Sequence, residues 1–203
     1  MQVMTKQTIV YTFDELSEKA KQKAMEDYVS YFDFEMDEEC ILEDIVESNP
    51  HIQDMNISYS GFYSQGDGAS FTGHLESDWV IQFLKEHFNN SQDITHTLSL
   101  IRWISISFER INSRYSHENT CTTELSVDAE WATHIEESET LKDSFNEKVS
   151  EFVEVIEEYR RDLCHTIYDR LHLAYEHATD EETVSEYFVE NDYDFEEDGS
   201  IYR

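Results

Sequence analysis

The fold is decided by residues 60–73, which read SGFYSQGDGASFTG and hold four of the five glycines in the chain. Glycine adopts positive φ angles without a steric penalty, so such a cluster marks special backbone geometry. The flanking residues 55–59 and 69–75 carry β-branched or aromatic side chains in rough alternation, which is typical of strands. Between them, Gly66-Asp67-Gly68 favours a tight turn. We therefore predict a β-hairpin centred on this stretch.

The same loop also admits a second interpretation, as a site for a small ligand. A glycine loop that binds phosphate normally opens a helix, and the P-loop contains a lysine. Here a strand-like segment follows the glycines and the loop contains no lysine, so a plain hairpin is favoured over a phosphate site. The alternative remains a ligand-binding module or small enzyme. Its candidate residues are Gln65, Gly66, Asp67, Gly68, Ser70 and, from a later turn, His117.

Further strands are predicted on both sides of the hairpin. Residues 120–131 alternate apolar and polar side chains throughout, and residues 98–111 do so over much of their length. Residues 8–13 read as a short first strand. Alternation of this kind predicts an antiparallel sheet of four or five strands with one packed face and one solvated face.

Helical periodicity fills most of the remaining chain. It predicts helices over residues 15–31, with Tyr28 and Tyr31 on the apolar face, and then over 33–47, 79–88 and 180–190. Residues 139–178 are predicted as one long helix or as two helices with a slight break. Asp14 or Ser17 would cap the first, and residues 89–93 read as a loop. The fold class is therefore α+β, with helices on one face of the sheet, including a long C-terminal helix. We predict a single domain over residues 1–203, whose acidic end at 190–203 adds an edge strand or stays mobile.

Charge is the dominant feature of the composition. The chain has 46 acidic and 14 basic residues, a net charge of −32, yet 39% of its residues are hydrophobic and 13% aromatic. This apolar content supports a folded core and excludes a disordered acidic chain. Such a surface repels nucleic acid and anionic membranes, and it attracts basic surfaces such as nucleic-acid-binding grooves. A plain role in solubility or in a salt-adapted host is the alternative.

Two acidic segments are candidate partner-binding surfaces. On the predicted long helix, carboxylates recur every three or four residues, which places neighbours about 5–6 Å apart on one face. Like charges at this spacing destabilise a helix slightly, so a function is one explanation and a solvated face the other. The first surface comprises Glu147, Glu151, Glu154, Glu158 and Asp162. The second, on the helix at 33–47, comprises Asp37, Glu38, Glu43 and Asp44.

Other chemistry has little support in the sequence. The three cysteines are far apart, which predicts free thiols in a reducing compartment. The histidines on the long helix lack the spacing of a zinc pair, and the acidic tail lacks the twelfth position of a calcium loop. Anion binding by Arg102, Arg110 and Arg114 is one alternative, but pairing with the many carboxylates is favoured. We predict no metal, no cofactor and no catalytic residues.

Two motifs carry a resemblance to a known group of proteins. The FDELSEKAKQKA helix at residues 13–24 and the SGFYSQGDGASFTG hairpin resemble a family of uncharacterised phage and prophage proteins. The resemblance implies a viral protein acting in a bacterial cytoplasm. This location agrees with the absence of a signal peptide and of any run of about 18 apolar residues. With the charge, it predicts a non-enzymatic inhibitor that binds a basic host defence protein, such as a restriction or CRISPR effector, by mimicking nucleic acid.

Overall fold

A computed structural model describes residues 8–99, 101–111, 114–129 and 139–202, without the side chains of 35–37, 129 and 139–142. The chain divides into two compact units. Unit 1 combines residues 1–39 with 171–203, and unit 2 comprises residues 40–170. Whether the chain behaves as a single domain stays a prediction, and each unit is described by itself.

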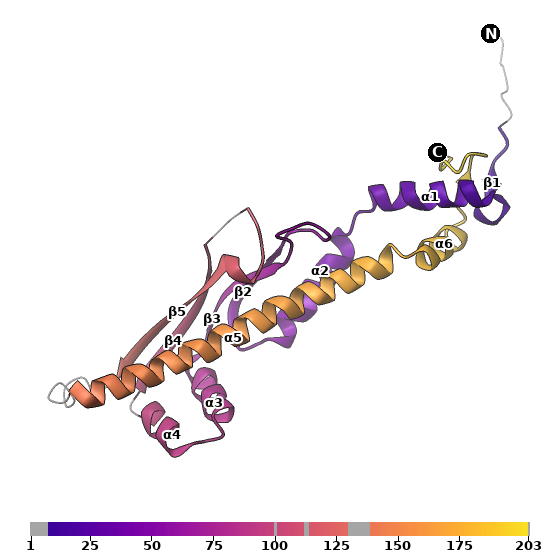
Figure 1. Cartoon of the computed structure of the whole chain (residues 1–203). Coiled ribbons are helices and arrows are strands. Elements are labelled where there is room, and N and C mark those ends of the chain that lie inside the picture. The colour runs from indigo at the N-terminus through magenta and orange to yellow at the C-terminus, as the bar shows by residue number, and fades with distance from the viewer. Residues whose placement is uncertain (1–7, 100, 112–113, 130–138, 203) are drawn as a thin grey trace, which may run out of the picture. The chain divides into compact units, whose positions relative to one another are not determined.

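Unit 2 is built on a four-stranded antiparallel sheet (Figure 1). Its strands occur in the sheet in chain order: β2 (Ile52–Tyr59), β3 (Ala69–Leu75), β4 (Ile101–Arg110) and β5 (Cys121–Ala129). On β5, Cys121 is buried and the exposed positions are the even-numbered ones, as the alternation predicts. The predicted α+β class with an antiparallel sheet is confirmed.

The hairpin between β2 and β3 forms with a longer loop than predicted. Tyr59 pairs with Ala69, and the amide of Ser60 donates to the carbonyl of Gly68 at 3.0 Å. Nine residues therefore lie between the strands, so the prediction of a tight turn is wrong. A reverse turn inside the loop brings the amide of Asp67 to 3.1 Å from the carbonyl of Ser64. In a second hydrogen bond between these residues, the amide of Ser64 donates to the Asp67 carboxylate.

The sheet of unit 2 is accompanied by α3 (Ser77–His87), α4 (Gln92–Ser99) and the first part of α5 (Glu139–Ala178), together with the end of α2 (Glu35–Ser48). Helix α4 corrects the prediction of a loop at 89–93 and of a strand from Leu98. The Ser91 hydroxyl accepts a bond from the amide of Ile94, and the buried Ile94 and Leu98 are four residues apart, as on one helical face. One pair of apolar residues four positions apart is too short a pattern to be recognised as a helix in the sequence.

Helix α5 is a single helix of 40 residues, which is the first of the two predicted alternatives. Its buried side chains in unit 2 recur every three or four residues and include Phe152, Ile156 and Ile167. They meet a core formed by the sheet residues Phe71, Ile104, Ile106 and Phe108, all at most 1% exposed. This apolar stripe stabilises the helix by burial, since propensity alone contributes little.

Unit 1 joins the two ends of the described chain. It contains β1 (Tyr11–Thr12), a 3₁₀ turn at Phe13–Glu15, α1 (Glu18–Tyr31), α6 (Glu181–Glu190) and β6 (Asp194–Phe195). Strands β1 and β6 pair antiparallel. Helix α2 (Glu35–Ser48) begins in unit 1 and continues into unit 2. The Ser17 side chain caps α1, so the second of the two predicted N-caps is the correct one.

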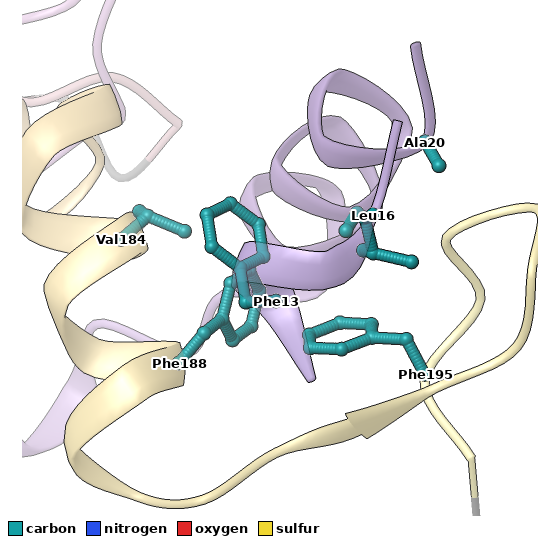
Figure 2. Packing of buried hydrophobic residues seen from close by; sticks show 7 residues of the cluster. Phe13, Leu16, Ala20, Val184, Phe188 and Phe195 are labelled. Atoms are coloured by element: carbon teal, nitrogen blue, oxygen red, sulfur yellow. The ribbon is translucent and has the colours of Figure 1, made fainter. Parts of the chain in front are cut away.

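Aromatic residues form the core of unit 1 (Figure 2). The ring of Phe188 lies 5.2 Å from that of Phe13 and 5.1 Å from that of Phe195. Phe195 is fully buried, so the tail is anchored around this residue. In contrast, Tyr31 is 88% exposed, and the prediction that it belongs to the apolar face of α1 is wrong.

Candidate functional site: the acidic face of helix α5

The predicted acidic stripe of α5 lies entirely in unit 2 and faces solvent. Glu147, Glu154, Glu158 and Asp162 are exposed, and none of them forms an ion pair with the residues that the structure describes. Fifteen residues separate the first from the last, a rise of about 22 Å along the helix axis. The stripe therefore presents uncompensated negative charge along one helix.

The fifth member of the stripe is partly neutralised. The ammonium of Lys148 lies 2.6 Å from the Glu151 carboxylate, which is 36% exposed. The hydrogen bond to Glu151 is the main cause that raises the pKa of Lys148, against a smaller effect of burial. The negative potential of neighbours such as Glu147 and Asp93 adds to this rise. Lys148 thus stays protonated and offsets one of the five carboxylates.

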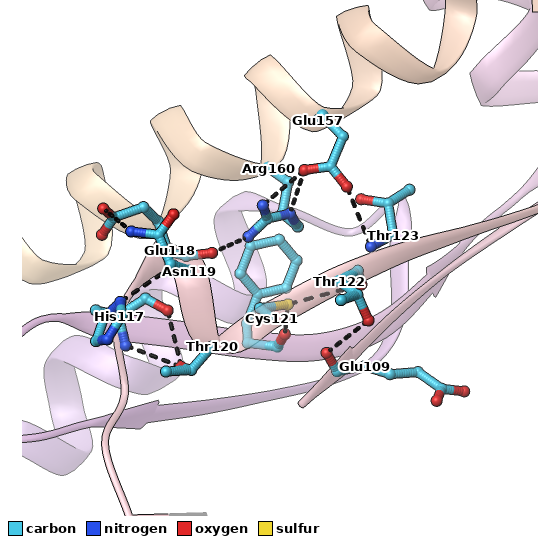
Figure 3. A network of polar contacts seen from close by, with 11 residues as sticks. Glu109, His117, Glu118, Asn119, Thr120, Cys121, Thr122, Thr123, Glu157 and Arg160 are labelled. Carbon is cyan, nitrogen blue, oxygen red and sulfur yellow. Dashed lines mark hydrogen bonds and ion pairs between the residues drawn. The ribbon is translucent and has the colours of Figure 1, made fainter. Parts of the chain in front are cut away.

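The orientation of α5 is fixed by a buried arginine on its inner side (Figure 3). Arg160 is 4% exposed, donates two hydrogen bonds to the Glu157 carboxylate at 2.6 and 3.1 Å, and donates another to the carbonyl of Glu118. Glu157 also accepts a bond from the amide of Thr123 on β5 at 3.2 Å. Glu158 lies about 200° around the helix from Arg160, given 3.6 residues per turn. The tie to β5 therefore turns Glu158 away from the sheet.

The ionisation of Glu157 follows from the same contacts. Burial alone would raise the pKa of Glu157, but the hydrogen bonds from Arg160 and Thr123 outweigh it and hold the pKa below its ordinary value. The carboxylate therefore remains charged and paired. Glu157 therefore helps to attach α5 to β5 and is not part of the acidic stripe.

The acidic residues predicted on α2 lie on both sides of the boundary between the two units. Asp37 and Glu38 belong to unit 1, whereas Glu43 and Asp44 belong to unit 2. The side chain of Asp37 lies outside the described residues, and Glu38 is half-buried. Glu43 is exposed, and Asp44 forms an ion pair with Arg170 of α5. Of these four, Glu43 adds exposed charge to unit 2.

The glycine hairpin packs against the turn that contains His117. A Cβ atom at Gly68 would lie 2.6 Å from the Cβ of His117, and one at Gly66 would lie 3.6 Å from the ring of Tyr115. Only glycine fits at position 68 without displacing this turn. The Ser60 hydroxyl links both segments, since it donates to the carbonyl of Ser116 and accepts from the Ser116 amide, both at 3.2 Å.

Arg110 completes this junction with hydroxyl partners. Its guanidinium donates to the side chains of Ser58 and Ser116, each at 2.9 Å. Within the described parts of the chain, no carboxylate lies within ion-pair distance of Arg110, which corrects the prediction that this arginine pairs with an acid. Ser58 and Ser116 could not be recognised from the sequence as partners of Arg110, because no sequence motif links them and only the fold brings them together.

The other predicted loop residues serve the loop itself or face solvent. Gln65 is exposed, and His117 accepts a hydrogen bond from the amide of Asn119 at 3.1 Å. Ser70 is fully buried, and its hydroxyl has no partner within the described residues. Gly68 and His117 are therefore in contact, but the polar groups around them hold two loops together.

The described residues form neither a metal-binding cluster nor a membrane-spanning helix. Within the described ranges, no group of three histidine, cysteine, aspartate or glutamate side chains is arranged to hold a metal ion. Burial raises the pKa of the Cys164 thiol to about 12, so this group stays protonated at neutral pH. No helix among the described residues has both the length and the apolar character needed to cross a membrane.

Comparison with known families supplies the classification of the chain. Residues 18–181 match a family described as a domain of unknown function, DUF8835. The chain belongs to this family. The match covers α1, the sheet of unit 2 and all of α5, so it includes both the acidic stripe and the glycine hairpin. Neither the curated proteins nor the solved structures gave a significant match.

Proposed function

We propose that this DUF8835 protein is a phage-encoded inhibitor of a host defence system that mimics nucleic acid. It would occupy the basic DNA- or RNA-binding groove of a restriction or CRISPR effector in the bacterial cytoplasm. The viral origin rests on the resemblance of the α1 and hairpin motifs to phage and prophage proteins. The choice of a basic partner rests on the charge of −32.

The stripe on α5 is the observation that carries this proposal. Its five carboxylates span about 22 Å of helix in four intervals, or about one charge every 5–6 Å, which is of the same order as the 3.4 Å per charge along one DNA strand. Four of them are exposed and form no ion pair with a described residue. The hydrogen bonds from the Thr123 amide to Glu157 and from Arg160 to the Glu118 carbonyl hold the helix that presents them. A fixed row of charges matches the fixed phosphates of a duplex.

The structure favours this surface over the glycine hairpin as the functional site. Asp67, Ser60 and His117 accept or donate hydrogen bonds within the loop or to the adjacent turn. Gly68 is required for the close approach of that turn. We therefore assign the hairpin a structural role, in which its specific sequence maintains the junction between two loops.

The first prediction tests the stripe by removing its charge. Changing Glu147, Glu151, Glu154 and Glu158 together to glutamine keeps side-chain size and reduces like-charge repulsion along the helix, so the melting temperature should not fall. A host protein captured by the wild type at low salt and released by duplex DNA or by salt should bind the variant at least tenfold more weakly. Its salt dependence should also flatten, because fewer charges contribute.

A matched control separates the stripe from net charge. Changing Glu186, Glu190, Glu196 and Glu197 of unit 1 to glutamine alters net charge by the same four units at exposed positions. This control should retain most of the partner affinity. A stripe variant that binds as tightly as the wild type would exclude α5 as the mimicking surface. If Asp67→Ala instead abolishes binding in a protein that still folds, the hairpin is the functional site.

A further inference from the structure

A groove of about 740 Å³ lies within unit 1, a volume typical of sites for ligands or short peptide segments. It lies between the end of α1, the start of α6 and the C-terminal tail. None of these residues belongs to the α5 stripe. The groove is lined by Asp27, Tyr28, Tyr31, Phe32, Asp33, Ala178, Thr183, Tyr187, Ser200 and Ile201.

Aromatic rings dominate the walls of this groove. The ring centroid of Tyr28 lies 5.4 Å from that of Tyr187 and 5.7 Å from that of Phe32. Tyr31 is 88% exposed and Tyr187 38% exposed, so both present large aromatic surfaces to solvent. Aromatic rings left exposed around a groove are typical of binding sites, since the same rings would be stabilised by burial.

The groove also carries negative charge. Its walls include the carboxylates of Asp27 and Asp33, and none of the described residues that line it is basic. Just outside it, the ammonium of Lys23 lies 3.3 Å from Asp27 and 3.4 Å from Asp198. Unit 1 as a whole contains 21 acidic and 5 basic residues. Lys23 therefore offsets part of the negative charge at this rim, and the net charge of unit 1 remains strongly negative.

We propose that this groove docks a segment of a partner protein that carries arginine or lysine next to apolar residues. A guanidinium or ammonium over a tyrosine face is attracted by the ring, and the neighbouring carboxylates add to this attraction. The aliphatic stems of such side chains cover apolar surface at the same time. A second copy of this chain would bring the same negative charge to the groove, so charge complementarity favours a basic segment.

The groove is separate from the surface assigned to nucleic-acid mimicry. It lies in unit 1, whereas the stripe at residues 147–162 lies in unit 2. The inference goes beyond the proposed function and does not depend on it. A basic partner would meet two different surfaces, one that presents a row of negative charges and one that accommodates individual cationic side chains.

The second prediction tests the groove in the full-length protein. We expect the peptide acetyl-Arg-Leu-Arg-Leu-amide to shift amide NMR signals of residues 27–33 and 183–201. The same peptide with citrulline for arginine should bind at least tenfold more weakly, because citrulline is neutral. Tyr31→Ala should weaken arginine-peptide binding at least threefold, and the further change Tyr187→Ala at least tenfold, as expected for lost cation–π contacts. Tyr63→Ala, at a residue 71% exposed in unit 2, is the matched control.

Several results would overturn the inference. These are equal binding of the citrulline peptide, peptide-induced shifts confined to α5, and arginine-peptide affinity that Tyr31→Ala leaves unchanged. A dimer in light scattering that Tyr31→Ala dissociates would make a second copy the occupant instead. The glutamine variant of the α5 stripe should keep its peptide affinity, so failure of the mimicry proposal and failure of the groove proposal give different results.

Discussion

At the scale of single residues, close backbone approaches explain why certain glycines are needed. Gly199 has a φ of +90°, and a Cβ atom there would overlap the carbonyl oxygen of Ala20 in α1. The tail passes α1 at this point, four residues after the buried Phe195. A Cβ at Gly61 would make only ordinary van der Waals contact with the Asp67 side chain, whereas one at Gly199 would meet rigid helix backbone that cannot move aside.

The third prediction follows from this difference. Gly199→Ala combines an unfavourable φ with a steric overlap, which should cost about 2–3 kcal/mol and lower the melting temperature by about 5–10 °C. Gly61→Ala also has a positive φ, of 57°, but its Cβ would lie 3.6 Å from the nearest atom, in the flexible side chain of Asp67. This control should cost about 1 kcal/mol. Equal melting temperatures for the two variants, measured by calorimetry, would contradict the role given to the contact with Ala20.

At the scale of elements, long periodic segments were predictable and short ones were not. The 40 residues of α5 and the alternation of β5 contain many repeats of one period, so local noise averages out. Helix α4 has 8 residues and only one pair of buried apolar side chains four residues apart, and it was predicted partly as loop and partly as strand. Its identity depends on burial of Ile94 and Leu98, which is set by the rest of unit 2.

The candidate sites were predictable only where they follow a single element. The α5 stripe is a property of one helix, so its spacing could be read directly. The groove in unit 1 combines Tyr28 and Tyr31 with Tyr187, more than 150 residues later, and no local pattern joins them. The hydroxyl partners of Arg110 were unpredictable for the same reason, because no local pattern joins Ser58 and Ser116, which meet only after the loops fold together.

One junction between elements should respond to pH. His51, next to β2, stacks on Trp79 of α3 with centroids 4.2 Å apart, and its Nε2 lies 2.6 Å from the hydroxyl of Tyr159 on α5. Burial lowers the pKa of His51 and raises the pKa of Tyr159. The folded protein therefore favours the neutral imidazole and the protonated phenol. His51 therefore stabilises the folded protein while its imidazole is uncharged.

The fourth prediction concerns this histidine. Because the unfolded chain binds the proton more readily, with a pKa of about 6.5, the contribution of His51 is fully present above that pH. It is lost as pH falls from about 6.5 through the lower pKa of the folded state. The difference in unfolding free energy between the wild type and His51→Gln should therefore shrink from pH 7.5 to pH 5 in urea titrations. Protonation of the many other acidic groups at low pH affects both proteins equally and cancels in this comparison. If the difference in unfolding free energy stays constant from pH 7.5 to pH 5, His51 is not the source of a pH-dependent stability.

At the scale of the whole molecule, the two units have separate apolar cores. The core of unit 1 contains Phe13, Phe188 and Phe195, whereas that of unit 2 contains Phe71 and Phe108, with ring centroids 4.9 Å apart. The sequence predicted a single domain, since no linker or change in composition marks a boundary. The units are interleaved in the chain, because unit 1 is made from both ends, and a linear pattern cannot reveal such a division.

The last prediction asks whether the units open separately. Phe195→Ala removes a fully buried ring and should cost about 3–5 kcal/mol. The change is confined to the core of unit 1, so opening should become easier there first, as in other proteins with locally cooperative units. In hydrogen exchange followed by mass spectrometry, peptides from α1 and α6 should lose protection, while peptides from β4 and β5 should keep theirs. Phe108→Ala, at a site 1% exposed in unit 2, should give the opposite pattern. If either variant lowers protection equally in both units, α5 couples them into the single cooperative domain that the sequence predicted.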